Sequence, residues 1–97
     1  MEIQTNYIEM LEQLPQPAFL VKDGAVLLAN QAALNRTLNI GDPVTELIKI
    51  GQQEYRDFSG GRLSLSLIIN GFTYNASVVK CDQLDLFYLE SDYEESE

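Results

Sequence analysis

Histidine is absent from this 97-residue sequence, and cysteine occurs only once, at position 81. Histidine is the side chain most often used as a general base, so Cys81 has no imidazole partner that could activate it as a nucleophile. A single cysteine also forms no internal disulfide, which is consistent with a reducing compartment. The sequence shows no convincing pair of catalytic carboxylates. We therefore expect neither enzymatic activity nor a metal site.

Basic residues are few, with 6 Lys and Arg against 15 Asp and Glu, for a net charge of −9. This excess of negative charge repels phosphate groups, which argues against nucleic acid and against an anionic membrane surface as partners. Five of the acidic residues lie in the last eight positions. Residues 91–97 are therefore predicted to be an acidic tail. We interpret it either as a frayed, solvated end or as the start of a helix that leads to an output domain.

Long apolar runs are missing as well. No stretch approaches the roughly 18 consecutive apolar residues that a membrane-spanning helix needs. The first residues lack the basic and then apolar pattern of a signal peptide. We expect a cytoplasmic protein and no membrane insertion by this segment.

Two hairpin signals dominate what the sequence does contain. In the first, PAFLVKDGAVLLAN (17–30), Asp23-Gly24 suits a two-residue type I′ turn between two strands. Pairing across this turn places apolar side chains on both faces of the hairpin, so both faces need a cover. The predicted faces are Phe19, Val21, Val26 and Leu28 on one side, and Ala18, Leu20, Leu27 and Ala29 on the other.

The second hairpin, over residues 62–80, turns at Asn70-Gly71. Its alternation predicts one buried face and one largely wet face of small polar residues, including Ser64 and Ser77. A last strand is predicted over 84–90. The predicted buried face consists of Leu63, Leu65, Leu67, Ile69, Phe72, Tyr74, Ala76 and Val78.

Helical patterns flank and separate these hairpins. An apolar stripe predicts an amphipathic helix over 1–14, which is marginal alone and must dock on something. Asn30 is the predicted N-cap of a short helix over 31–38, with Ala33, Leu34, Thr37 and Leu38 as its buried side. A second helix should begin at Asp42-Pro43 and run to near Gly51. One more turn over 52–58 should direct Tyr55 and Phe58 inward.

This order of elements predicts an α+β domain over 15–90, with a five-stranded antiparallel sheet. Short helices inserted between the second and third strands should cover one face of the sheet. The N-terminal helix is left to cover the other face, either on its own sheet or on that of a second subunit. Its candidate dimer residues are Ile3, Tyr7, Met10, Leu11 and Leu14.

Residues 14–33, 41–48 and 60–90 resemble the opening hairpin, middle helices and last three strands of a PAS domain. The version they resemble is the sensory part of bacterial sensor histidine kinases. The resemblance implies a strand order of 2-1-5-4-3, a role in two-component signal transduction and dimerisation through the helix before the first strand. A histidine that could bind haem is missing, and Cys81 lies outside the middle segment where light-sensing relatives attach flavin. Neither cofactor is expected, and any kinase activity would reside in other segments.

The resemblance also suggests a small-molecule ligand of unknown identity between the middle helices and the sheet. Candidate residues of this pocket are Phe19, Leu28, Leu65, Leu67 and Tyr74. Tyr55, Arg36 and Arg62 are either polar anchors of such a pocket or ordinary packed and solvated side chains. The leading hypothesis is a sensory module that forms a homodimer. The alternative is a stand-alone protein-interaction adaptor that binds no ligand.

Overall fold

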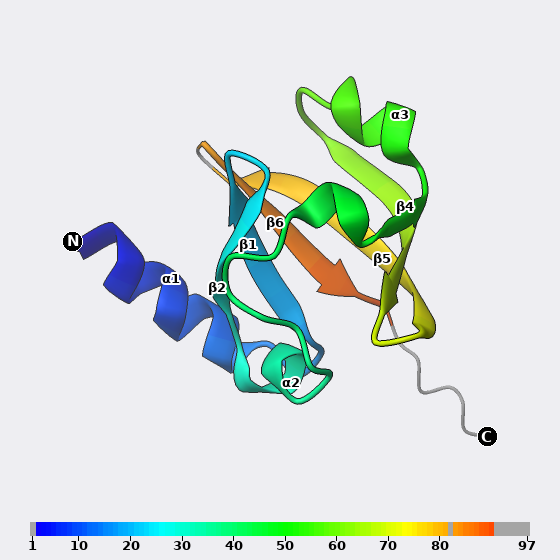
Figure 1. Cartoon of the computed structure of the whole chain (residues 1–97). Helices are drawn as coiled ribbons and strands as arrows, with labels where there is room; N and C mark the ends of the chain where they lie inside the picture. The colour runs from blue at the N-terminus through cyan, green and yellow to red at the C-terminus, as the bar shows by residue number, and fades with distance from the viewer. Residues whose placement is uncertain (1, 82, 91–97) are drawn as a thin grey trace.

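The computed structural model describes residues 2–81 and 83–90, with side chains from residue 7 onward except at position 81. The predicted acidic tail, 91–97, and the side chain of Ile3 lie outside the described residues. Figure 1 shows the arrangement of the helices and strands. They are α1 (Glu2–Gln13), β1 (Ala18–Lys22), β2 (Ala25–Ala29), α2 (Gln31–Leu34), the 3₁₀ turn η1 (Val44–Glu46), β3 (Ile48–Ile50), α3 (Gln52–Arg56), β4 (Arg62–Ile69), β5 (Phe72–Cys81) and β6 (Leu84–Leu89).

All the strands belong to one antiparallel sheet in the order β2-β1-β6-β5-β4-β3. The prediction of five strands is wrong by one, because Ile48–Ile50 forms an edge strand instead of continuing a helix. Ile48 pairs with Leu67 of β4, and Gly51, at φ 113°, turns the chain into α3. Two β-branched residues flanking one lysine fit a short strand better than a helix.

The predicted helix start at Asp42-Pro43 is also wrong. Pro43 is extended, with ψ at 123°, and only the single turn of η1 follows it. The Asp42 carboxylate accepts a hydrogen bond from the Asn39 N–H, 3.1 Å away, instead of capping a helix. Backbone pairing explains the extended conformation: Val26 N–H donates to Asp42 O (2.9 Å), and Val44 N–H donates to Gly24 O (2.8 Å). This segment thereby covers the outer edge of β2 before crossing to the other edge at β3 (Figure 1).

Helix α2 is shorter than predicted, ending at Leu34. Thr37 adopts a positive φ of 67°, which a continuing right-handed helix does not allow. Ala33 and Leu38 are buried as expected, whereas Leu34 and Thr37 are exposed. The predicted buried side is therefore half right.

The first hairpin forms its type I′ turn, with positive φ at both Asp23 and Gly24. Val21 pairs with Val26 as predicted, but the register then shifts, so that Leu20 pairs with Leu28. The extra residue is a β-bulge, which moves the following side chains to the other face. The placement of Leu28 on the face of Phe19 is therefore wrong.

The register of the second hairpin is confirmed, from Ile69 opposite Phe72 to Leu63 opposite Val78. Two side chains depart from the predicted burial. Phe72 is exposed beside the turn, and Ser77, on the face predicted to be wet, is fully buried. Ser77 pairs with Tyr88 of β6, and its hydroxyl contacts the side chains of Arg62 and Glu90.

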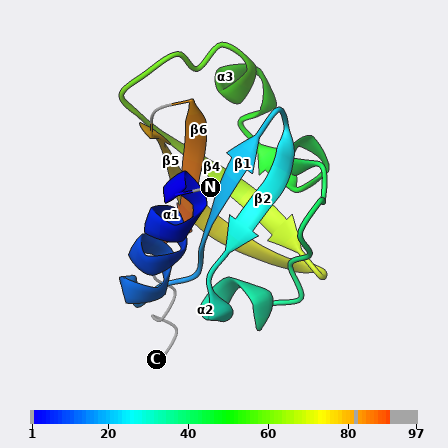
Figure 2. The same cartoon turned by 90° about the vertical axis from the view of Figure 1, so that its left-hand side faces the viewer.

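Apolar side chains form two clusters, one on each face of the sheet. The larger cluster lies under α2, η1 and α3 and includes Phe19 and Phe87. The second lies under α1 and includes Leu11, Ala18 and Leu20. Figure 2 looks onto α1 in front of the sheet. The prediction that the first hairpin is covered on both faces is confirmed, and α1 docks on its own sheet.

Candidate functional site

The structure brings together four of the five predicted pocket residues. Phe19, Leu65 and Leu67 are buried in the larger cluster, and Tyr74 packs against it. Leu28 lies on the opposite face, in the cluster under α1. The bulge in the first hairpin separates Leu28 from the others, and sequence alone offers no signal for it.

Aromatic rings pack together around Phe19, one of the predicted pocket residues. Phe19 stacks on Phe87 with 5.0 Å between ring centroids and 7° between planes. Tyr55 meets Phe87 edge-on at 5.4 Å and 60°. Both phenylalanines are fully buried. The sequence prediction missed Phe87, although alternation along 84–90 was available to place it on this face.

Next to these rings, under α3, lies a cluster of polar side chains formed by Tyr55, Lys80 and Asp85. The Tyr55 hydroxyl donates a 2.7 Å hydrogen bond to Asp85 Oδ2, and Lys80 Nζ lies 2.8 Å from Asp85 Oδ1. Burial raises the pKa of Tyr55 well above its usual value, and the hydrogen bond to Asp85 raises it further. Lys80 also lies over the Phe58 ring, 5.4 Å from its centroid. Tyr55 and Phe58 thus attach α3 to the sheet, as their predicted inward direction implies.

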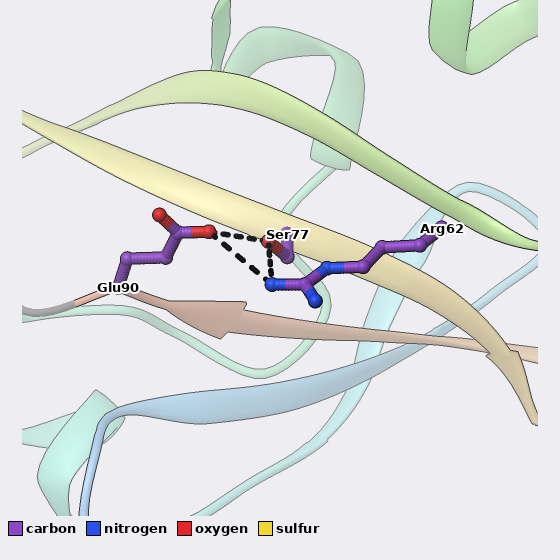
Figure 3. A network of polar contacts seen from close by, with 3 residues as sticks. All are labelled: Arg62, Ser77 and Glu90. Atoms are coloured by element: carbon purple, nitrogen blue, oxygen red, sulfur yellow. Dashed lines mark hydrogen bonds and ion pairs between the residues drawn. The ribbon is translucent and has the colours of Figure 1, made fainter.

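The predicted polar anchors do not converge on one site. Arg36 lies over the Tyr74 ring, 5.6 Å from the centroid, at the larger cluster. Arg62 reaches the other face, where it donates to Ser77 Oγ (3.3 Å) and lies 3.8 Å from Glu90 (Figure 3). Ser77 in turn donates to Glu90 Oε2 at 2.5 Å. Arg62 is therefore engaged at the end of β6 and does not face the predicted pocket.

The apolar stripe of α1 packs largely against the sheet of its own chain. Tyr7 and Leu11 are buried in the second cluster, with Met10 and Leu14 packed against it. Ile8 remains 47% exposed, beside this docked stripe. The predicted dimer residues from Tyr7 onward thus hold α1 on its own sheet, and Ile8 is the large apolar side chain that the described part of α1 leaves exposed.

Asn30 lies where α1, β1 and α2 meet, and it is 2% exposed. Its Oδ1 accepts hydrogen bonds from the N–H groups of Ala33 (2.9 Å) and Ala18 (3.1 Å). Its Nδ2 donates to Leu11 O (2.9 Å) and Gln16 O (3.0 Å). The two donors and two acceptor positions of the amide are all used.

The N-cap role predicted for Asn30 is confirmed by the bond from Ala33. The other three bonds join it to residues 12 to 19 positions away. Their partners are backbone groups, which every residue carries, so the sequence offers no signal for them. One side chain consequently caps the start of α2 and ties down the end of α1.

No protein-family model and no curated protein matches this chain. Among the described residues, no helix is long and apolar enough to cross a membrane. Within the same residues, His, Cys, Asp and Glu side chains do not gather into a group of three or more suited to a metal ion.

Proposed function

We propose that the chain is a non-catalytic sensory and dimerisation module of the PAS type, serving as the input domain of a sensor histidine kinase. The strand order carries this proposal. With the short edge strand β3 set aside, the order is β2-β1-β6-β5-β4. Numbered as the five predicted strands, this is the 2-1-5-4-3 order that the resemblance implies. The short helices between β2 and β4 also support it.

The dimer contact would involve α1 and the part of the outer sheet face that α1 leaves open. On that face Ser64, Thr73 and Asn75 of β4 and β5 are exposed. Ile8 adds an exposed apolar side chain on α1. In the proposed mechanism, a signal changes how the sheet holds α1, which biases a dimer between two arrangements.

Light scattering or sedimentation equilibrium of two matched variants tests this contact. Ile8→Glu places a charge on the proposed interface, and Ile50→Glu places the same charge on β3, where Ile50 is 64% exposed. We expect a dimer for the unaltered chain and for Ile50→Glu, and a monomer for Ile8→Glu. A monomeric unaltered chain at high concentration would refute dimerisation. Leu11→Asp is unsuitable, because Leu11 supports the fold.

One observation favours the alternative, a protein-interaction adaptor that senses no ligand. Phe19, a predicted pocket residue, is fully buried and stacks on Phe87, and Tyr55 meets Phe87 edge-on, so these side chains pack against one another. Native mass spectrometry of the purified protein separates the two functions. A small molecule that stays bound to the purified chain would exclude the ligand-free adaptor. A chain that carries no small molecule but binds a partner protein would favour the adaptor.

A further inference from the structure

We infer that the Asn30 side chain couples the docking of α1 to the capping of α2, so that a change on one face of the sheet reaches the other face. This coupling goes beyond the proposed function, because it requires neither a ligand nor a second copy of the chain. Its test therefore stands or falls separately from dimerisation.

The two ends of the amide serve different elements. The Nδ2 end holds the last turn of α1 and the link after it, through Leu11 O and Gln16 O. The Oδ1 end holds β1 and α2, through the N–H groups of Ala18 and Ala33. A carboxamide is planar, so a rotation that follows one set of partners moves the atoms that face the other set.

Burial makes this arrangement sensitive to a displacement of α1. With Asn30 2% exposed, water does not readily replace a lost partner. A buried donor without a partner is unfavourable, so the amide reorients once Leu11 O moves away. Reorientation weakens the bond from Ala33, on which the first turn of this four-residue helix depends.

The two faces of the sheet hold separate apolar clusters, so the coupling would join two distinct packing sites. Leu11 belongs to the cluster under α1, and Ala33 belongs to the larger cluster on the opposite face. Helix α1 alone is too short to be stable in water, so loss of docking also loosens its backbone. Helix α1 has two states, docked and undocked, and the orientation of the Asn30 amide in each state would determine how well α2 is capped.

A cycle of variants tests the coupling by NMR measurement of amide exchange at Ala33. Leu11→Ala weakens the docking of α1 in the unaltered chain and in an Asn30→Ser background. Serine keeps an N-cap oxygen for Ala33 but lacks the two amide donors. We expect Leu11→Ala to speed exchange at Ala33 by about 10-fold with Asn30 present and by less than about 2-fold with Asn30→Ser, since one net hydrogen bond is at stake.

Leu67→Ala provides the matched control, because it truncates a fully buried leucine that belongs to β4 and not to α1. It should change exchange at Ala33 equally in both backgrounds. Should Asn30→Ser fail to fold, Asn30→Asp serves instead, because it keeps both acceptor positions and removes both donors at neutral pH. Equal effects of Leu11→Ala with and without Asn30 would overturn the inference.

Discussion

The hydroxyl of Tyr55 donates a 2.7 Å hydrogen bond to Asp85, and this contact ties α3 to β6. Helix α3 contains no fully buried residue. It begins after Gly51 and is followed by a loop that contains Gly60 and Gly61. Its position over the larger cluster therefore depends on a few side chains, with Tyr55 foremost.

Removal of the Tyr55 hydroxyl should destabilise the protein although the ring remains. Tyr55→Phe leaves a mostly buried Asp85 oxygen without its donor, and we expect a loss of about 1–3 kcal/mol in the free energy of unfolding. Urea denaturation measures this loss. Tyr74→Phe is the matched control, because Arg36 contacts the face of that ring, and it should cost less than about 0.5 kcal/mol. Similar losses in both variants would contradict the role given to the Tyr55–Asp85 bond.

The raised pKa of Tyr55 makes this stabilisation depend on pH. The folded state favours the protonated phenol more than the unfolded state does, so the contribution is fully present below the unfolded pKa of about 10. It is lost as pH rises above that value. We expect the unaltered protein to lose more stability than Tyr55→Phe between neutral and alkaline pH, as measured by urea denaturation. Lys80, which faces Asp85, is present in both proteins, so the difference between their two pH profiles does not include its contribution. Parallel pH profiles would be inconsistent with this prediction.

Gly51 lies where the backbone passes close to β4. Its φ is 113°, and a Cβ there would lie 2.8 Å from Leu65 Cβ. Gly51→Ala therefore combines backbone strain with a steric clash, and we expect a loss of about 2–4 kcal/mol in the free energy of unfolding. Gly24→Ala is the control, because Gly24 also has a positive φ but open space around it, and it should cost about 1–2 kcal/mol. Thermal and urea unfolding compare the two variants. Equal costs would show that the approach to Leu65 is unimportant.

Short-range signals predicted the hairpins well. Asp23-Gly24 and Asn70-Gly71 both adopt the positive φ values of their turns. The second hairpin also has the predicted register, because strict alternation leaves a one-residue slip with polar residues in the core. The first hairpin is apolar on both faces, so its pattern did not exclude the bulge that moves Leu28. The pattern of β3 was ambiguous in another way, because its three residues are too few to show the two-residue period of a strand.

Asn30 separates what the sequence by itself determined from what only the tertiary structure decided. Its N-cap bond to Ala33 spans three residues and follows from the amino-acid type and the pattern after it. Its bonds to Leu11, Gln16 and Ala18 depend on where the sheet places α1. The sequence likewise required a cover for each face of the first hairpin, but packing decided that α1 supplies one of them. Turns and caps are set by neighbouring residues, whereas contacts between distant backbone groups exist only once the chain has folded.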